Sequence, residues 1–217
     1  MRFSVQDAGE VQAVLLRPKN AECVLVLAHG AGAGMNHPFM TALAYKLADA
    51  GVATLRFQFP YMEQRRRVPD RPAVLTATVQ AAVQAASKAA PDLPLFAGGK
   101  SLGGRMSSLA AAEGRLGNVR GLVFFGFPLH PPNRPGTKRA EHLREVKLPM
   151  LFLQGTRDAL ADLQLLRPIC AELGAQATLH TIEGADHSFH VLKSSSKTDE
   201  GVLEELAKNA SAWTKRL

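Results

Sequence analysis

The chain has little cysteine, no long hydrophobic run and few aromatic residues. Only two of its 217 residues are cysteines, Cys23 and Cys170, and neither belongs to a metal-ligand spacing, so we expect buried, reduced thiols and no bound metal. The longest apolar stretch, residues 23–28, is far shorter than the roughly 20 residues of a membrane-spanning helix. Residues 1–20 contain neither the apolar core nor the cleavage site of a secretory signal. The sequence therefore predicts a cytoplasmic protein without a membrane partner.

The composition also excludes disordered and fibrous proteins. Hydrophobic residues make up 46% of the chain and charged residues 21%, near the averages of globular proteins, and the 18 glycines and 13 prolines follow no repeat. A length of 217 residues is typical of one domain with a sizeable core. We therefore expect residues 1–217 to form a single domain.

The net charge is positive and concentrated in two segments. The formal net charge is +7, and most of it lies in residues 61–72 and 127–148. No aromatic residue lies between the arginines of the first segment, as stacking on bases would need, so we expect no nucleic-acid partner. Both segments follow predicted strands, and at the rim of a site their charge would attract an anionic substrate. Arg65 and Arg66 are therefore candidate substrate-binding residues; the alternative is a solvated loop.

Short apolar runs rich in β-branched residues alternate with longer segments of helical periodicity. This alternation is typical of a mostly parallel sheet with helices on both faces, so the predicted fold class is α/β. The last helix is expected to begin near Thr198 or Asp199. Residues 3–5 and 11–16 are expected to pair antiparallel. The predicted strands that follow them are residues 23–28, 53–57, 95–98, 122–125, 150–154 and 177–182.

A Gly-x-Ser-x-Gly pattern at residues 99–103 follows the strand 95–98 and precedes a helix. In this context the pattern is typical of a nucleophile elbow, in which Gly99 and Gly103 allow a tight turn and Ser101 takes a strained backbone conformation that exposes its hydroxyl. The positive end of the following helix points at the same serine. Ser101 is therefore the candidate nucleophile.

Two nucleotide-binding motifs resemble parts of the sequence and do not fit. Gly-Lys-Ser at residues 99–101 would complete a phosphate loop only with glycine at position 94, which is Pro94. The glycines of residues 30–34 would complete a dinucleotide fingerprint only with glycine at position 35, which is Met35. We therefore expect no cofactor. The loop instead suits an oxyanion hole, with the backbone amides of Ala31 and Leu102 as donors.

An acid and a base follow in the order that a serine hydrolase of this architecture requires. The strand 150–154 leads to Asp158, and the strand 177–182 leads to His187. Because parallel strands end at one edge of a sheet, both side chains can reach Ser101 there. We predict that His187 takes the seryl proton and that Asp158 orients the imidazole and stabilises the imidazolium.

Other roles remain open for several of these residues. Asp158 could instead cap a helix beginning at residue 159, and Asp186 or Glu183 could serve as the acid. Two further histidines are candidates for the substrate-binding region. His29 is expected to hydrogen-bond within its turn beside the oxyanion loop, and His130 to line the site from the loop after the strand 122–125.

The sequence resembles the α/β-hydrolase superfamily, and more narrowly a dienelactone-hydrolase-like branch that includes testis-expressed protein 30 and bacterial hydrolases. By this resemblance Ser101, Asp158 and His187 form the triad, and the amides of Ala31 and Leu102 are the oxyanion donors. The nucleophile is serine where true dienelactone hydrolases have cysteine, so dienelactone is not implied as substrate. The resemblance rests on His29-Gly-Ala-Gly32, Asn36-His-Pro38, Gly98-Gly-Lys-Ser-Leu-Gly-Gly-Arg105, Pro128-Leu-His-Pro-Pro132, Gln154-Gly-Thr-Arg-Asp158 and Asp186-His-Ser-Phe189.

The expected function is a serine hydrolase for small, accessible esters or thioesters. Residues 127–148 are too short to hold a lid domain, which favours an open site over one for membrane lipids. The expected partner is thus a small-molecule substrate; neither acyl chain length nor oligomeric state is readable from the sequence. The alternative is a non-enzymatic function, in which a protein with the hydrolase fold serves as a binding or scaffolding protein without significant turnover.

Overall fold

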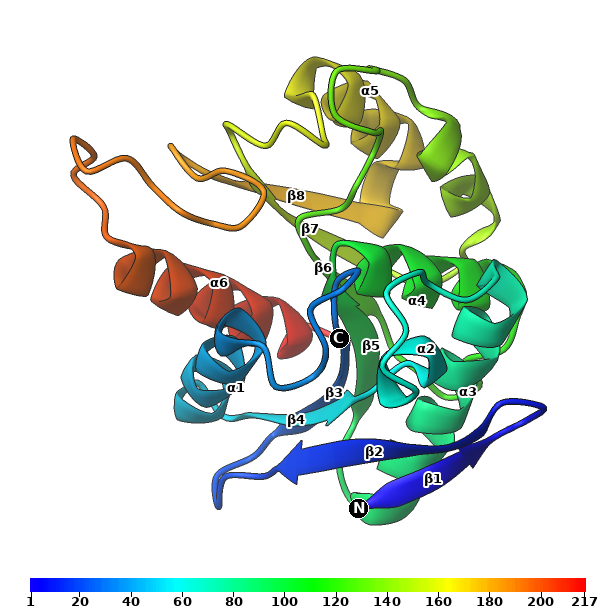
Figure 1. Cartoon of the computed structure of the whole chain (residues 1–217). Helices are drawn as coiled ribbons and strands as arrows, with labels where there is room; N and C mark the ends of the chain where they lie inside the picture. The colour runs from blue at the N-terminus through cyan, green and yellow to red at the C-terminus, as the bar shows by residue number, and fades with distance from the viewer.

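The computed structural model describes residues 1–217 and has one eight-stranded sheet with helices on both faces (Figure 1). The strands are β1 (Arg2–Val5), β2 (Gly9–Leu16), β3 (Cys23–Ala28), β4 (Val52–Phe57), β5 (Leu95–Lys100), β6 (Leu122–Phe125), β7 (Met150–Gly155) and β8 (Ala177–Ile182). The α-helices are α1 (Pro38–Asp49), α2 (Pro60–Glu63), α3 (Pro72–Ala89), α4 (Leu102–Ala112), α5 (Leu163–Leu173) and α6 (Asp199–Thr214). Two short 3-10 helices are η1 (Lys138–Glu145) and η2 (Gly174–Gln176).

The order of the strands brings the functional loops to one edge of the sheet. The order is β1-β2-β4-β3-β5-β6-β7-β8; neighbours are parallel from β4 to β8, and β1 and β2 form the predicted antiparallel pair. Ala28, the last residue of β3, pairs with Gly99 near the end of β5. The loop after β3 and the turn after β5 therefore begin side by side. The α/β fold predicted from the sequence is confirmed.

Side chains of the central strands alternate between two cores. Val24 and Val26 of β3 belong to the core under α3, α4 and α5, whereas Leu25 and Leu27 belong to the core under α1 and α6. A parallel strand covered on both faces is apolar at every position, and this explains why residues 23–28 read as one continuous hydrophobic run.

The element bounds follow local sequence signals closely. The bounds of β3, β6 and β8 are those predicted, and the other strands differ from prediction by one or two residues at an end. Thr198 caps α6, since its side chain accepts a hydrogen bond from the Gly201 amide. No helix combines the length and the apolar character that a transmembrane span requires.

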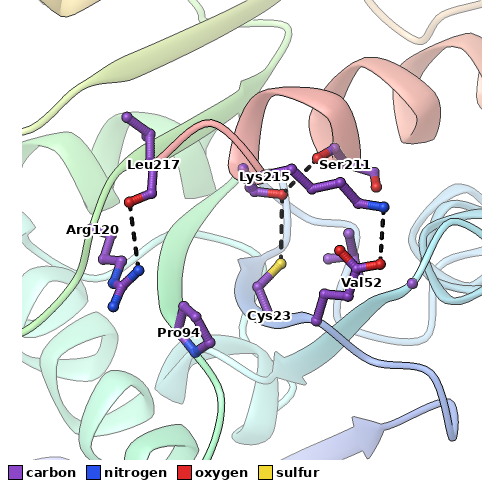
Figure 2. Close-up of a pocket in the computed structure, with 10 residues that line it drawn as sticks. Cys23, Val52, Pro94, Arg120, Ser211, Lys215 and Leu217 are labelled. Carbon is purple, nitrogen blue, oxygen red and sulfur yellow. Dashed lines mark hydrogen bonds and ion pairs between the residues drawn. The ribbon is translucent and has the colours of Figure 1, made fainter.

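The last turn of α6 and the C-terminal residues lie at the amino end of the sheet, opposite to Ser101. A cavity of about 290 Å³ opens there, where the Arg120 guanidinium donates to the Leu217 carbonyl and the Cys23 thiol donates to the Thr214 hydroxyl (Figure 2). Burial raises the pKa of the Cys23 thiol and raises the pKa of Cys170 to about 11. Both cysteines are buried free thiols, as predicted.

Candidate active site

Ser101 lies in a strained turn between β5 and α4. Its backbone has φ 50° and ψ −114°, a region that non-glycine residues rarely occupy. A Cβ atom at Gly99 or at Gly103 would overlap the backbone oxygen of Ala28. The turn therefore requires glycine at both positions, for the steric reason expected from the sequence.

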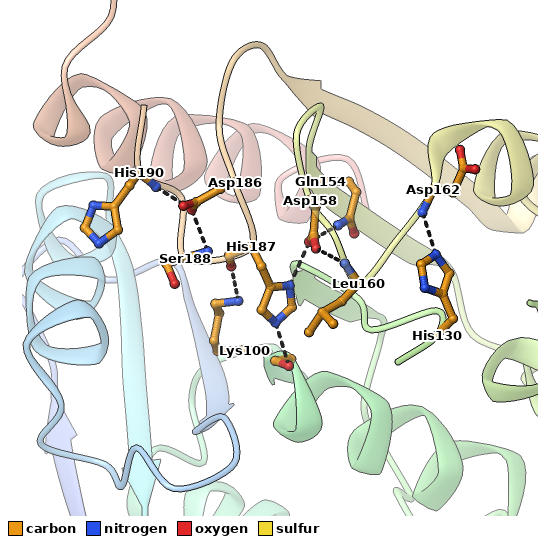
Figure 3. Close-up of polar contacts among 11 residues, drawn as sticks. Lys100, His130, Gln154, Asp158, Leu160, Asp162, Asp186, His187, Ser188 and His190 are labelled. Carbon is orange, nitrogen blue, oxygen red and sulfur yellow. Dashed lines mark hydrogen bonds and ion pairs between the residues drawn. The ribbon is translucent and has the colours of Figure 1, made fainter. Parts of the chain in front are cut away.

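The structure brings Ser101, His187 and Asp158 together. His187 Nε2 lies 2.9 Å from Ser101 Oγ, and its Nδ1 lies 2.7 Å from Asp158 Oδ2 (Figure 3). The histidine comes from the loop after β8 and the aspartate from the turn after β7. The imidazole therefore bridges a hydroxyl and a carboxylate, an arrangement that can carry a proton away from the serine.

Asp158 is buried and fully hydrogen-bonded. Its side chain has no exposed surface; Oδ2 also accepts from the Gln154 amide at 2.5 Å, and Oδ1 accepts from the Leu160 backbone N–H at 2.7 Å. The interpretation of Asp158 as a helix cap is wrong. The helix α5 begins at Leu163, and Asp162 caps it by accepting from the Gln164 amide.

The rival acids face other groups. Asp186 accepts hydrogen bonds from the backbone amides of Ser188 and His190, which shape the loop that carries His187. Glu183 contacts the hydroxyl of Thr156. Of the three candidate acids, Asp158 alone contacts the His187 ring.

Two backbone amides near Ser101 lack an acceptor within the protein. The Ala31 amide donates no hydrogen bond, whereas its neighbours do: Gly32 donates to the Tyr61 hydroxyl, and Ala33 to the Gly30 carbonyl. The Leu102 amide is the first of α4, where N–H groups have no partner inside the helix. Both residues therefore offer the free donors that the oxyanion-hole hypothesis needs.

A cavity of about 700 Å³ opens beside Ser101, between the loop after β3, α1, the loop after β8 and α6. The rings of Phe39 and Phe189 stack in it with centroids 5.8 Å apart and planes 9° from parallel. His190 and Asp199 also line the cavity and form an ion pair of 2.6 Å, which raises the pKa of His190. The sequence did not mark these phenylalanines as lining residues. Phe39 recurs at helical spacing, which is typical of core positions, and Phe189 lies in the loop that carries His187, where no pattern assigned it a role.

The structure gives His29 and His130 roles other than substrate binding, which corrects that part of the sequence-based hypothesis; the expected hydrogen bond of His29 within its own turn is confirmed. His29 is fully buried; Nδ1 donates to the Gly30 carbonyl at 2.7 Å, and Nε2 accepts from the Phe59 amide at 3.1 Å. His130 is equally occupied, donating to the Pro131 carbonyl and accepting from the Asp162 amide. Neither histidine has a ring nitrogen left for a ligand, so both stabilise loops near the site.

Arg65 and Arg66 do not line the cavity beside Ser101. Both side chains are exposed, and Arg66 is paired with Asp70 at 2.5 Å. We therefore expect neither arginine to contact a substrate bound at Ser101 directly. Their charge can still attract an anionic substrate over a longer distance.

Known proteins are similar to this chain in sequence and in architecture. A family model described as an alpha/beta hydrolase domain matches residues 21–215. A dienelactone hydrolase from Anabaena variabilis is similar with TM-score 0.77 and 24% identity, over 100% of this chain and 95% of that one. An α/β serine hydrolase without a lid from Xanthomonas campestris is similar with TM-score 0.77 and 20% identity, over 98% and 93%.

A curated relative comes from Mycobacterium tuberculosis and carries the provisional name of phosphoribosyl transferase. It is 30% identical over 202 residues, which are 90% of this chain and 41% of the relative. This chain thus spans about two fifths of the length of that protein.

Proposed function

The chain belongs to the alpha/beta hydrolase family, and from this premise we propose that it is a serine hydrolase acting on carboxylic esters or thioesters. One observation carries the proposal: the His187 imidazole lies 2.9 Å from the Ser101 hydroxyl and 2.7 Å from the buried Asp158 carboxylate. A serine hydroxyl is a weak nucleophile until a neighbouring base removes its proton, and this cluster supplies the base and a group that orients it.

The first half-reaction acylates the enzyme. As Ser101 Oγ attacks the carbonyl carbon, its proton passes to His187 Nε2, and the carbonyl oxygen becomes an oxyanion that accepts from the Ala31 and Leu102 amides. Asp158 stabilises the imidazolium that has formed. The bond to the leaving group then breaks as His187 protonates the departing alkoxide or thiolate.

The second half-reaction releases the acid. Water takes the place of the leaving group, gives a proton to His187 Nε2 and attacks the acyl carbon. The tetrahedral intermediate collapses when Ser101 leaves and recovers its proton from the imidazolium. The products are a carboxylic acid and the regenerated serine, with no cofactor required for the atom balance.

The cavity supports an apolar acyl or alkyl group as the part of the substrate next to Ser101. Phe39, Phe189, Leu160 and Leu203 line it, and its acidic side chain, Asp199, is already paired with His190. A volume of about 700 Å³ lies within the usual range of small-molecule sites.

A fluorophosphonate probe tests the proposal directly. We expect covalent labelling of Ser101, loss of labelling in Ser101→Ala, and loss of most turnover of p-nitrophenyl esters and acyl-CoA thioesters; in a serine protease the equivalent change costs about 10⁶-fold in kcat. Ser108→Ala is the matched control. Its hydroxyl also contacts a histidine, His142 at 2.7 Å, but Ser108 is a buried helical residue outside the cavity.

Other outcomes of these experiments would favour a different function. Equal labelling of Ser101→Ala and the wild type, or residual turnover within tenfold, would remove Ser101 from the mechanism. A wild type that is neither labelled nor active on any ester would favour a binding or scaffolding role. Release of diphosphate from a phosphoribosyl diphosphate would favour the activity in the mycobacterial relative's name.

A further inference from the structure

Lys100 immediately precedes Ser101, and its ammonium group lies inside the candidate site. The residue is 9% exposed, and Nζ donates a hydrogen bond of 2.5 Å to the backbone oxygen of His187 (Figure 3). Two consecutive residues of the elbow therefore hold the histidine at two points: the Ser101 hydroxyl contacts its ring, and the Lys100 ammonium contacts its backbone.

The surroundings of Nζ are apolar apart from the triad loops. The rings of Phe39 on α1 and Phe189 after β8 lie with their centroids 5.9 and 5.3 Å from Nζ. On the side of β6, a Cβ atom at Gly126 would lie 3.0 Å from it. The ammonium has a single hydrogen-bond acceptor, the His187 carbonyl.

Several charged and titratable groups surround Nζ. The carboxylates of Asp158, after β7, and Asp186, after β8, act on it through space, and the His187 ring lies against Gly126, as Nζ does. His37, before α1, and the paired His190 and Asp199 line the same cavity as Lys100. Lys100 donates a hydrogen bond to none of these carboxylates. Its charge therefore acts on the triad through space, and its hydrogen bond acts on the backbone of His187.

Stability alone does not account for a lysine at this position. A buried ammonium with one acceptor is less favourable than the same group in water, and burial lowers the pKa of Lys100 to about 8. An unbranched apolar side chain such as methionine could fill the same space without that penalty. We therefore look for a role of the Lys100 charge in the chemistry of the site.

We propose that Lys100 is a positioning residue of the triad, which fixes the backbone of His187 against Ser101 and keeps a positive charge beside the imidazole. The proposal rests on the serine-hydrolase function above. A positive charge opposes a second positive charge nearby, whereas the Asp158 carboxylate favours one, so these two buried charges act on the imidazole in opposite directions.

Two substitutions separate the charge from the hydrogen bond. Lys100→Gln removes the charge and keeps an N–H donor, whereas Lys100→Met removes both. We expect the acid limb of the kcat/KM profile to move to higher pH by about one unit in both variants. At the plateau, Lys100→Met should lose about tenfold or more in kcat with KM within about threefold, because the imidazole is less well aligned, and Lys100→Gln should recover most of this loss.

Lys19→Gln is the matched control, since it removes one lysine charge from the exposed turn before β3, at the end of the sheet opposite to Ser101. Its profile should coincide with that of the wild type. An unchanged acid limb in both Lys100 variants would overturn the charge effect, and a wild-type plateau in Lys100→Met would overturn the positioning role. Thermal unfolding shows whether each variant is folded. If Lys100→Met does not fold, the position of the acid limb in the kcat/KM profile of Lys100→Gln tests the proposal alone.

A measurement without turnover keeps this proposal distinct from the proposed function. Histidine labelled with ¹⁵N, with the His187 signals assigned by comparison with His187→Gln, reports protonation of the ring directly. If the wild type hydrolyses no ester but the His187 titration moves to higher pH in Lys100→Gln, the serine-hydrolase function fails and the charge effect stands. If the wild type hydrolyses esters and the titration does not move, the charge effect fails and the function stands.

Discussion

His187 Nε2 lies 2.9 Å from Ser101 Oγ, although 86 residues separate the two along the chain. Each is held from a different side. Ser101 is fixed by a turn with no room for a side chain at Gly99 or Gly103, and His187 is fixed by the buried carboxylate of Asp158. The hydrogen bond between Ser101 and His187 therefore depends on both the turn and the Asp158 carboxylate, and a substitution can remove either one separately.

Removing the carboxylate of Asp158 should disable the imidazole. Asp158 accepts three hydrogen bonds, from His187, Gln154 and the Leu160 amide. In Asp158→Asn the new NH₂ group must face one of these donors, so we expect kcat to fall by about 10⁴-fold, as in a serine protease with the same change. Ester hydrolysis under saturating substrate measures it.

Asp162→Asn is the matched control for that substitution. Asp162 caps α5 through the Gln164 amide, and asparagine caps helices as well as aspartate does. Its kcat should stay within about twofold of the wild type. Equal losses in the two variants would mean that the carboxylate of Asp158 has no special part in the reaction.

The elbow glycines are expected to be essential for folding. A methyl group at Gly103 would overlap the carbonyl oxygen of Ala28, which lies in a central strand and cannot move away cheaply. We expect Gly103→Ala to lower the free energy of unfolding by about 3 kcal/mol or more. In Gly136→Ala the new methyl would meet no atom within 4 Å, so urea denaturation should find little change there; matching curves for the two variants would contradict the steric argument.

The parts of the site that the sequence predicted are those with local signals. The elbow was recognisable because its glycines and serine are contiguous, and Asp158 and His187 because each follows a strand of a parallel sheet. For His29 the sequence predicted the hydrogen bond within the turn, but not the one from the Phe59 amide, 30 residues away. For His130 it did not indicate the hydrogen bond from the Asp162 amide, 32 residues away. No local sequence pattern indicates a hydrogen bond between a side chain and a backbone amide so far along the chain.

Lys100 is a second residue whose hydrogen-bond partner the sequence does not indicate. It stands inside the most recognisable motif of the chain, where it first suggests a phosphate loop. Its acceptor, the carbonyl of His187, lies 87 residues away and is a backbone atom, which any residue type would supply. Likewise, the sequence left open that Asp158 caps a helix, and only the start of α5 at Leu163, with Asp162 as its cap, excludes this.

The buried imidazole of His29 should make the fold sensitive to acid. Burial lowers the pKa of His29 to about 4 from 6.5. Between these values the unfolded chain binds a proton that the folded protein does not, so the free energy of unfolding falls as the pH is lowered from about 6.5 to 4, by about 2–3 kcal/mol. Urea titrations at several pH values measure this dependence.

His29→Gln isolates that contribution, because glutamine does not titrate. Its free energy of unfolding should be lower at neutral pH, where two hydrogen bonds are disturbed, but should fall less steeply below pH 6.5. Some dependence should remain, since burial and Arg105 also lower the pKa of His142 to about 4. Parallel pH curves for His29→Gln and the wild type would refute the assignment.

Arg65 tests whether the basic segment attracts an anionic substrate from a distance. Arg65 is exposed and does not line the cavity, so its charge can act only through the solvent. We expect Arg65→Gln to lower kcat/KM for an anionic ester by about two- to fivefold at low salt, with kcat unchanged, and to have no effect on a neutral ester. The difference should vanish at about 0.5 M salt, because the Debye length then falls to about 4 Å.

Arg115→Gln removes the same charge at the far end of α4 from Ser101, where Arg115 pairs with Glu113. Its effect on the anionic ester should be small at every salt concentration. If both variants lower kcat/KM equally, the protein's net charge rather than the position of Arg65 governs association. If anionic and neutral esters depend on ionic strength in the same way in the wild type, there is no steering, and residues 61–72 are a solvated loop.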